Sequence, residues 1–350
     1  MPRFRRTIVV ASLIVLDYGA SLADTVVPRD SVVNWVNIRE DGIPGPSVPV
    51  VGHLHPGESA EFLSEVASYY EVKLDNGIIG FAHKSWTHRV AESVSNIKIA
   101  TFNIQIFGET KAGKPAVMAE LASIIRKYDI VAIQEIKNIG QTVPTLFLNE
   151  INSDGSAYMF VLSARTGQQP DDSGGQEQYA YYLNTETLRV IEDAGLFDDS
   201  ANDLFQREPY VARFGVIDGN FTFALITVHT KPERAVAETK ALHDVFIWAQ
   251  DQFPSEDDFI ALGDFNASCD YASPSDFVGS PIRDDYTWIV PDDADTNFST
   301  TEACAYDRIV ITEDTEEDYA DNFGVDTSVS SNIVSDHFPV WAEFHSANDN

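Results

Sequence analysis

Five apolar runs of the sequence each end in side chains that can bind a metal or exchange a proton. They are Ile97–Phe102 followed by Asn103, Asp129–Ile133 by Glu135, Phe223–Val228 by His229, Phe259–Leu262 by Asp264 and Asn266, and Ile333–Val334 by Asp336 and His337. Short apolar runs are typical of buried strands. A charged group inside such a sheet would be unpaired, so we expect it at the strand end. If these ends meet at one edge, their carboxylates, imidazoles and amides suit a hard divalent cation and acid–base catalysis, the equipment for phosphoester hydrolysis.

The elements that would position these side chains alternate between strands and helices from Ile97 onward. Two segments carry apolar residues at helical spacing, which predicts helices with a buried face. They are Pro115–Lys127, with Val117, Leu121, Ile124 and Ile125, and Glu233–Gln250, with Leu242, Val245, Phe246 and Ala249. The acidic run Glu313–Asp321 is predicted to be a solvated loop and not a metal site.

Residues 24–90 have a different pattern, in which short alternating segments are separated by turn residues. This pattern predicts a small all-β barrel. The stretches "VNIRE", "GHLHPGE" and "YYEVKLDNGIIGFAHKSW" resemble the bacterial SH3 family over most of residues 30–87. The resemblance implies a module that binds a cell wall or another surface, and a packing or spacer domain is the alternative. We expect residues 91–96 to be a linker and residues 97–350 a catalytic domain.

The N-terminus has the pattern of a secretory signal peptide in residues 1–23. Arg3, Arg5 and Arg6 precede an apolar stretch, Thr7–Leu16, and the small residues of Ser21–Ala23 suit cleavage. An N-terminal membrane anchor is the alternative, but the apolar stretch falls short of the roughly 20 residues that a spanning helix needs. We therefore expect a secreted protein, extracellular or periplasmic, without stable membrane association.

Length and charge narrow the class of protein. The chain has 350 residues, of which 44% are hydrophobic, enough for one large core and a small extra domain. Its formal net charge is -32. A charge of this sign argues against tight, non-specific binding of nucleic acid at low salt, and it suits a protein kept soluble in a saline setting.

The chain contains two cysteines, Cys269 and Cys304. In an exported protein the simplest interpretation is one disulfide between them. Closing a loop of this length would stabilise the fold by about 3–4 kcal/mol. Two free buried thiols are the alternative.

Seven stretches in order resemble the deoxyribonuclease-I family of the endonuclease/exonuclease/phosphatase superfamily. They are "IKIATFNIQIFGETK", "YDIVAIQEI", "FQREP", "TVHTKPERAVAE", "LGDFNASCDY", "ACAYDRIVI" and "SDHFPV", and the resemblance covers nearly all of residues 96–345. It implies an α/β fold, a four-layer αββα sandwich in which two β-sheets pack face to face with helices outside. It also implies metal-dependent cleavage of phosphodiester bonds, with DNA as the expected substrate.

The resemblance implies a role for particular residues. Glu135, Asn103 and Asp336 look like a site for Mg²⁺ or Mn²⁺, which would neutralise charge that grows on the phosphate. For Asn103, an amide that closes a turn after the strand is the alternative. Two pairs, His229 with Glu177 and His337 with Asp307, look like acid–base dyads. Such dyads can activate water and protonate the leaving oxygen, because a carboxylate fixes the imidazole tautomer and raises its pKa. We expect His53, His55, His83, His88, His243 and His345 to serve only packing or the surface.

Further residues are expected beside the phosphate. Asp264 would orient the attacking water or hold a second cation, and Asn266 would donate to a phosphoryl oxygen; an Asx-turn is compatible with both. Arg207 matches the phosphate-contacting arginine of the family, and an ion pair with Glu208 or a nearby Asp is the alternative. Arg283, Arg308 and Lys111 are weaker candidates for contacts with the nucleic-acid backbone.

Two acidic segments resemble the structural calcium sites of the family. The first comprises Asp199, Asp203, the carbonyl of Phe205, and Glu208; the second comprises Asp295, Asn297 and Thr301. Oxygen ligands in short loops suit Ca²⁺, and solvated loops are the alternative.

The chain departs from the family where the family grips duplex DNA. Lys137 stands where an arginine is usual, Gln105 replaces a basic residue, and the run Asp171–Gly175 replaces a stacking tyrosine. The loop before Arg207 is also shorter and lacks a second disulfide. These changes predict weaker groove contact, tolerance of single strands and a shallow dependence on salt.

Two other functions compete with a nuclease. A phospholipid or inositol phosphodiesterase of the same superfamily would fit the negative charge, but the chain shows no exposed aromatic hairpin for docking on a membrane. A non-catalytic surface-binding protein is disfavoured, because a competent residue occupies each expected catalytic position. We expect a monomer, and the choice between DNA and RNA stays open.

Overall fold

The computed structural model describes residues 24–29, 31–43, 45, 47–90, 96–167, 175–217, 219–299 and 301–347. The predicted signal peptide and most of the predicted linker lie outside the described residues. The chain divides into two compact units, Met1–Ser93 and Val94–Asn350. Within the described part of the chain, no helix is long and apolar enough to cross a membrane.

The first unit is a seven-stranded antiparallel sheet in the order β3-β2-β6-β5-β4-β1-β7. Its strands are β1 (Thr25–Pro28), β2 (Val36–Arg39), β3 (Val50–Leu54), β4 (Ala60–Val66), β5 (Tyr69–Lys73), β6 (Ile79–His83) and β7 (Thr87–Val90). The sheet encloses a small core that includes Val26, Ile38 and Val72. The all-β character predicted for this region is therefore confirmed.

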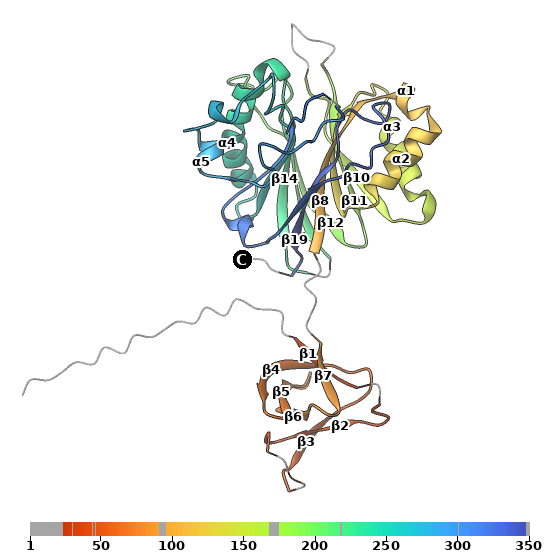
Figure 1. Cartoon of the computed structure of the whole chain (residues 1–350), viewed down its shortest axis with the longest axis vertical. Helices are drawn as coiled ribbons and strands as arrows, with labels where there is room; N and C mark the ends of the chain where they lie inside the picture. Colours follow the sequence, from red (N-terminus) through yellow and green to blue (C-terminus); the bar gives the residue numbers. More distant parts are fainter. Residues whose placement is uncertain are drawn as a thin grey trace, which may run out of the picture. The chain divides into compact units, whose positions relative to one another are not determined.

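The second unit contains two six-stranded sheets (Figure 1). The first has the order β10-β11-β9-β8-β19-β18, and the second β12-β13-β14-β15-β17-β16. The first sheet comprises β8 (Asn96–Phe107), β9 (Ile130–Ile136), β10 (Tyr158–Leu162), β11 (Gln178–Asn184), β18 (Tyr319–Val325) and β19 (Val340–His345). The second comprises β12 (Leu188–Leu196), β13 (Tyr210–Val216), β14 (Thr222–His229), β15 (Phe259–Asp264), β16 (Thr287–Trp288) and β17 (Asp307–Ile311). The pairs β8/β9 and β14/β15 are parallel, and the other neighbours are antiparallel.

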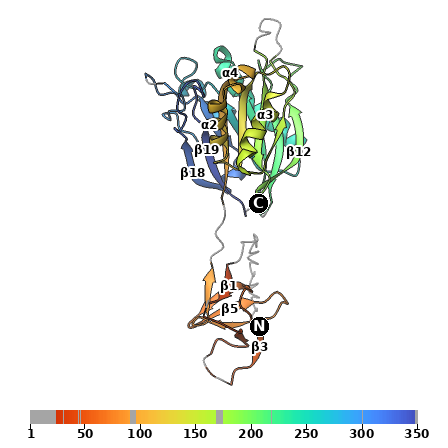
Figure 2. The same cartoon turned by 90° about the vertical axis from the view of Figure 1, so that its right-hand side faces the viewer.

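Helices cover the outer face of each sheet, as Figures 1 and 2 show. The helices α1 (Glu109–Ala112), α2 (Pro115–Ile125) and α3 (Val143–Ile151) lie on the first sheet, and α4 (Ala235–Gln252) and α5 (Pro281–Asp284) on the second. Short 3-10 turns occur at Asn152–Asp154, Pro232–Arg234, Pro274–Asp276 and Asp314–Glu316. Because both faces of each sheet are covered, strands such as β14 are apolar at nearly every position, and Leu225 faces the other sheet while Ile226 faces the helices. The predicted mixed fold with packed sheets is confirmed.

The helices expected from apolar spacing form close to the predicted bounds. The segment Pro115–Lys127 contains α2, and Glu233–Gln250 contains most of α4, whose start is preceded by a 3-10 turn. The prediction for the acidic run Glu313–Asp321 is wrong in part. The run is not only a solvated loop, because Thr315 and Asp318 are fully buried. Thr315 accepts a hydrogen bond from the backbone N–H of Phe259 at 3.1 Å, which ties the run to the start of β15.

Gly263, the penultimate residue of β15, lies where no side chain fits. Its φ is +146°, and a Cβ atom there would lie 1.9 Å from the carbonyl oxygen of Val228 on β14. We expect Gly263→Ala to lower the free energy of unfolding by about 2–4 kcal/mol, since the parallel strands would have to separate. Urea denaturation would measure the loss. Gly155→Ala is the control, because Gly155 also has a positive φ (+99°) but open space around it; equal losses in the two variants would contradict the steric argument.

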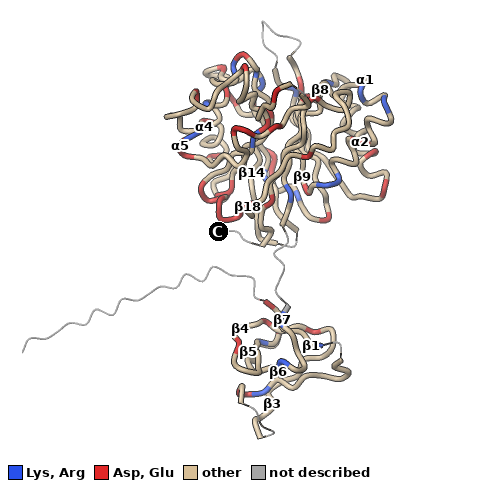
Figure 3. Tube along the Cα trace, viewed as in Figure 1, with Lys and Arg blue, Asp and Glu red and all other residues tan. Residues whose placement is uncertain are grey.

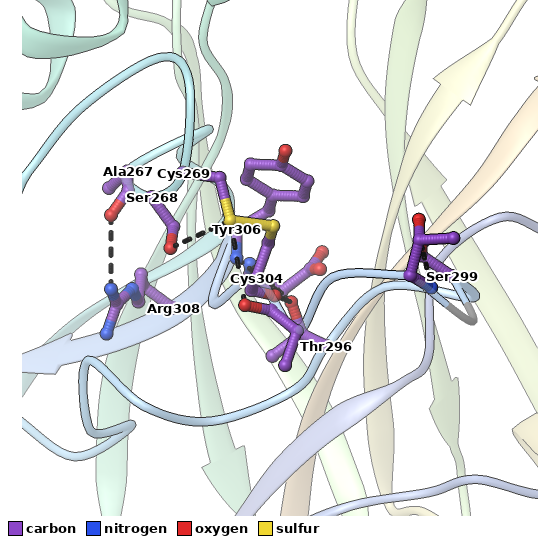
Figure 4. Close-up of a disulfide and its surroundings, with 11 residues drawn as sticks. Ala267, Ser268, Cys269, Thr296, Ser299, Cys304, Tyr306 and Arg308 are labelled. Atoms are coloured by element: carbon purple, nitrogen blue, oxygen red, sulfur yellow. Dashed lines mark hydrogen bonds between the residues drawn. A yellow bond between two sulfur atoms is a disulfide. The ribbon is translucent and has the colours of Figure 1, made fainter.

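A disulfide joins the segment that follows β15 to the segment that precedes β17 in the second sheet (Figure 4). Cys269 follows β15 and Cys304 precedes β17, and their Cα atoms are 5.8 Å apart. Beside it, Arg308 Nη2 donates to the carbonyl of Ala267 at 3.1 Å, and Thr296 Oγ1 donates to that of Cys304 at 3.1 Å. The pairing predicted from the sequence is therefore present.

Loss of this disulfide should weaken the fold. We expect the double change Cys269→Ser and Cys304→Ser to lower the free energy of unfolding by about 3–4 kcal/mol, because a loop of 35 residues is released in the unfolded chain. Denaturant titration of the oxidised protein and the variant measures the difference. A difference below about 1 kcal/mol would show that the loops hold together without the bond.

Candidate active site

One edge of the two sheets collects the polar strand ends. The ends of the parallel pairs β8/β9 and β14/β15 lie there, and the antiparallel strands β11, β17 and β19 begin there. In the second sheet, His229, Asp264 and Asp307 occupy neighbouring register positions. The side chains gathered at the edge are Asn103, Glu135, Glu177, His229, Asp264, Asp307, Asp336 and His337. The expectation that Ile333–Val334 forms a buried strand before Asp336 is wrong, because this run lies in a turn and Ile333 is exposed.

The first imidazole–carboxylate pair joins the two sheets. His229 Nδ1 lies 2.8 Å from Glu177 Oε1, and the Glu177 side chain is fully buried. The backbone N–H of His229 donates to the hydroxyl of the buried Tyr179 at 3.1 Å. Contacts on both the ring and the backbone therefore orient this imidazole, with Nε2 directed away from Glu177.

The second pair has the same geometry. His337 Nδ1 lies 2.8 Å from Asp307 Oδ2, and Asp307 is fully buried. Burial alone would lower the pKa of His337, but the carboxylates of Asp307, Asp264 and Asp336 raise it to about 10. At neutral pH, in the absence of a cation, this imidazole therefore carries a proton.

Asp264 lies between the two imidazoles. Its Oδ2 atom is 3.5 Å from His229 Nε2 and 3.5 Å from His337 Nε2. The same oxygen accepts a hydrogen bond from Asn103 Nδ2 at 3.0 Å. Two proton-exchanging atoms, one at the end of β14 and one in the segment before β19, thus converge on one carboxylate. The arrangement suits a reaction in which one group accepts a proton and another donates one.

Asn266 adopts a positive φ of 48° just after β15. Its N–H donates to Asp264 Oδ1 at 3.0 Å, which is the Asx-turn expected as a compatible alternative. Its Nδ2 donates to the carbonyl of Thr230 at 3.1 Å. The amide has one further hydrogen for another acceptor.

The residues expected to bind a divalent cation lie next to this group. Glu135 Oε1 accepts from Asn103 Nδ2 at 3.2 Å, and its Oε2 accepts from the N–H of Ile106 at 2.8 Å. Burial would raise the pKa of Glu135, but His229, Lys137 and these hydrogen bonds lower it to about 2. Asp336 Oδ1 is buried and has no hydrogen-bond partner among the described residues. An ionised carboxylate, a partnerless carboxylate oxygen and an amide oxygen fit a hard cation.

The alternative considered for Asn103, an amide that closes a turn after the strand, is present only in part, because Asn103 lies inside β8 and not at its end. Its Oδ1 accepts the N–H of Gln105 at 2.9 Å. Asp264, Asp307 and His337 each offer one ligand atom, and these three atoms lie within 4.8 Å of one another, so this trio is itself a candidate for a cation.

Arg207 is buried behind the first pair. Its Nε donates to the carbonyl of His229 at 2.9 Å, its Nη2 donates to that of Thr230 at 2.8 Å, and its Nε lies 3.4 Å from Glu177 Oε1. The alternative of an ion pair with Glu208 is wrong in its partner, because Glu208 instead accepts from the hydroxyl of Thr166. Arg207 therefore supports the end of β14 and the Glu177 carboxylate, and its contact with substrate phosphate stays a prediction.

Two of the three cations considered for backbone contacts do not face solvent. Lys111 Nζ donates to the carbonyls of Ile104 and Val334 at 2.7 and 2.9 Å, and burial lowers its pKa to about 8. Arg308 donates to the carbonyl of Val290 at 2.8 Å, and burial lowers its pKa to about 10. Those expectations are wrong, because both side chains satisfy carbonyl groups that the fold buries. Arg283 is partly exposed and pairs with Asp292 at 3.0 Å.

Lys137 also has a different neighbourhood from the one expected. Its Nζ lies 3.6 Å from Glu135 Oε2 and 4.0 Å from Glu177 Oε2. It therefore balances charge between the two carboxylates. The other surprise is Gln105, whose Nε2 donates to Asp336 Oδ2 at 2.8 Å. The only sign in the sequence that Gln105 has a special role was its departure from the family pattern.

In the first acidic segment considered for calcium, the carboxylates do not converge on one point. Asp199 Oδ2 accepts the N–H of Phe205 at 2.9 Å, and burial together with Glu208 and Asp203 raises its pKa. These three described carboxylates do not form a group whose oxygens lie within 4.8 Å of one another.

In the second acidic segment considered for calcium, one residue, Asn297, has close polar neighbours. The carboxamide of Asn297 faces Asp295 Oδ1 and the carbonyl of Glu302, each at 3.1 Å. Through its amide nitrogen, Asn297 donates a hydrogen bond to both of these oxygens. Thr301 contacts Ser299 through its hydroxyl at 3.1 Å.

The remaining histidines that have described ring contacts pack against aromatic or polar neighbours. His53 and His55 lie against Trp35, His83 against Tyr69, His243 against Tyr286, and His345 bonds to Asn96.

Comparison with known proteins places these observations in a family. The profile described as "Endonuclease/Exonuclease/phosphatase family" matches residues 100–337. Deoxyribonuclease-1 of Canis lupus familiaris is 34% identical over 262 residues, covering 70% of this chain and 90% of the relative. Deoxyribonuclease-1 of Homo sapiens is 36% identical over 229 residues, covering 62% and 77%. Among solved structures, the human Nocturnin catalytic domain with bound sulfate has the same fold, with a TM-score of 0.51 and 16% identity over 73% of this chain and 95% of that one.

Proposed function

Because the chain belongs to the endonuclease/exonuclease/phosphatase family, we propose that it is a divalent-metal-dependent endonuclease that hydrolyses phosphodiester bonds of DNA. One observation carries the proposal: two imidazoles, each held by a buried carboxylate, direct Nε2 at the same oxygen of Asp264. Relatives named deoxyribonuclease-1, more than 30% identical, support DNA as the substrate class.

The proposed division of labour follows from the positions of the groups. Glu135, Asn103 and Asp336 would hold Mg²⁺ or Mn²⁺, which supplies positive charge opposite the phosphate in the transition state. Of the two imidazoles, one takes a proton from the attacking water and the other donates a proton to the leaving oxygen. Asp264 orients the water between them, and Arg207 keeps Glu177 and the end of β14 in place.

Supercoiled plasmid provides the direct test. The protein, residues 24–350, is incubated with Mg²⁺ plus Ca²⁺ and then with EDTA, and nicking is followed on gels. We expect nicking that depends on the cation. If a folded, cation-loaded protein leaves the plasmid intact but hydrolyses phospholipid in liposomes or an inositol phosphodiester, DNA is the wrong substrate and the competing phosphodiesterase is right.

Few cations are available to grip a duplex. The chain has 23 Lys and Arg against 55 Asp and Glu, and Figure 3 shows acidic residues spread through the second unit. Several of its cations, including Lys111, Arg207 and Arg308, are buried. The structure therefore supports the prediction of weak groove contact and tolerance of single strands.

The dependence on salt measures the number of phosphate contacts. We expect cleavage of duplex DNA to fall by less than about tenfold between roughly 0.05 and 0.2 M NaCl at saturating Mg²⁺, because few cations are displaced. Initial rates at subsaturating DNA provide the measurement. A fall of about 10³-fold or more would show six or more phosphate contacts and contradict the prediction.

We also propose that the first unit is an SH3-like barrel that binds a cell-wall or surface ligand. The supporting observation is a groove of about 610 Å³ lined by Trp35, Trp86, Tyr69 and His83. Trp35 and Trp86 are 50% and 55% exposed. Exposed tryptophans in a groove are typical of binding surfaces.

Co-sedimentation with purified bacterial cell walls tests this second role. The variant Trp35→Ala with Trp86→Ala should stay in the supernatant while the wild type and a Leu63→Ala control sediment. Equal sedimentation of all three would remove the groove from the proposal, and no sedimentation of any would favour a spacer.

Three further properties concern export, quaternary structure and calcium binding. We propose cleavage after Ala23, secretion as a monomer, and Ca²⁺ binding at Asp295 and Asn297 as well as near Asp199. The disulfide between Cys269 and Cys304 supports an oxidising compartment. N-terminal sequencing of protein recovered from the medium or periplasm checks the export step.

A further inference from the structure

The residues Gln105 and Ile106 adopt an unfavourable backbone conformation within β8. Their φ angles are 43° and 49°, in the left-handed region. This region is an outlier for a β-branched residue such as isoleucine. The side chain of Ile106 is also 60% exposed, so its burial does not offset the strain. The pairing of β8 with β9 changes register between Asn103 and Phe107, which isolates these two residues from the regular ladder.

Hydrogen bonds from this pair reach every residue proposed to hold the cation. The N–H of Gln105 donates to Asn103 Oδ1 at 2.9 Å, and the N–H of Ile106 donates to Glu135 Oε2 at 2.8 Å. The Gln105 side chain donates from Nε2 to Asp336 Oδ2 at 2.8 Å. Three donors from two residues thus orient three ligands from three parts of the chain.

We propose that Gln105 and Ile106 form a positioning element for the divalent-cation site, and that the neutral side chain of Gln105 raises the affinity of this site for the cation. This inference rests on the proposed function, which supplies the cation. By bonding to Oδ2 of Asp336, the Gln105 amide leaves the buried Oδ1 as the oxygen that can bind a cation. This oxygen has no hydrogen-bond partner among the described residues and lies 4.0 Å from His337 Nε2. It orients that carboxylate without adding a positive charge beside the cation.

A basic side chain at this position, the residue type that the family pattern leads one to expect, would act differently. It would pair with the Asp336 carboxylate and repel a divalent cation a few ångströms away. The neutral amide therefore makes no charged contact with substrate phosphate, and it leaves the cation site more negative than a basic side chain would. The strained backbone of Ile106 is retained because its N–H orients Glu135, not because of its side chain.

The test measures cation binding apart from catalysis. Mg²⁺ binding to the full chain, residues 24–350, is followed by calorimetry and by the rise in Tm with Mg²⁺ concentration. Glu135→Gln identifies the part of the binding that belongs to this site. We expect Gln105→Ala to weaken that part about 10–100-fold, as loss of a hydrogen bond to a ligand typically does, and Gln105→Arg to weaken it further.

Two further variants separate positioning from general damage. Gln141→Ala is the matched control, since Gln141 has a φ of 52° and is exposed, but its side chain makes no hydrogen bond to a proposed ligand in the described structure. Ile106→Gly keeps the N–H and relieves the strain, so we expect an unchanged Mg²⁺ Kd and an equal or higher Tm without Mg²⁺.

Each outcome decides the inference. An unchanged Mg²⁺ Kd in Gln105→Ala, or equal Mg²⁺ binding by wild type and Glu135→Gln, overturns it. Weaker binding in Gln105→Ala by a protein that fails to cleave DNA upholds this inference while removing the proposed substrate. Cleavage of DNA with no effect of Gln105→Ala on Mg²⁺ binding upholds the proposed substrate and overturns this inference.

Discussion

Replacing His229 with alanine is expected to lower the rate of DNA cleavage about 10²–10⁴-fold, and His337→Ala is expected to do the same. Each imidazole is held at Nδ1 by a buried carboxylate at 2.8 Å, and each Nε2 lies 3.5 Å from Asp264. Removing either ring removes one of the two groups that move a proton in the transition state. Initial rates of plasmid nicking at saturating Mg²⁺ measure the effect.

A matched control separates catalysis from folding. His243 lies against Tyr286 with a ring-centroid distance of 5.9 Å, away from the strand ends that form the site. We expect His243→Ala to nick plasmid at a rate within about twofold of the wild type. The double variant His229→Ala with His337→Ala should lose less than the product of the single losses, because the two groups act in one reaction. Full activity in either single variant would exclude that dyad from the chemistry.

Removal of divalent cations is expected to lower cleavage by at least about 10³-fold, since a bound cation supplies several kcal/mol of charge stabilisation in the transition state. Glu135→Gln should reproduce much of this loss in the presence of Mg²⁺. The change keeps the shape of the side chain but removes a carboxylate whose low pKa, about 2, keeps it ionised under assay conditions. Cleavage rates before and after dialysis against EDTA provide the measurement.

The control for this second prediction is an acidic residue outside the site. Glu186 is exposed in the turn between β11 and β12, and Glu186→Gln should cleave DNA like the wild type. Readdition of Mg²⁺ or Mn²⁺ should restore the wild type fully and Glu135→Gln only at a much higher concentration. Cleavage that persists after exhaustive dialysis against EDTA would contradict a cation-dependent mechanism.

The sequence was most informative where burial decides the local structure. A strand covered on both faces must be apolar almost throughout, so runs such as Phe223–Val228 reveal both the strand and its polar end. The apolar stripe of Pro115–Lys127 identified α2 for the same reason. These features depend on a few neighbouring residues, and therefore a single sequence contains them.

Predictions from the sequence were wrong about the binding partners of two long cationic side chains. Lys111 and Arg308 were considered for contacts with nucleic acid, yet each bonds to carbonyl groups inside the fold. A cationic residue looks the same in the sequence whether its side chain meets solvent or a buried carbonyl. The acidic residue Asp318 shows the same limit, because its full burial depends on segments that pack around it.

The sequence alone indicated the mixed α/β class and four of the five predicted strands that lead to polar groups. The family resemblance implied the packed sheets, and one disulfide was the simplest interpretation of the two cysteines. The tertiary structure decided how these groups meet. His229 reaches Glu177 across 52 positions of the chain, and Gln105 reaches Asp336 across 231. The physical reason is that the apolar pattern of a segment, which favours its burial, lies in that segment's own side chains. A hydrogen bond between distant segments depends instead on register and on backbone angles such as those of Gln105 and Ile106.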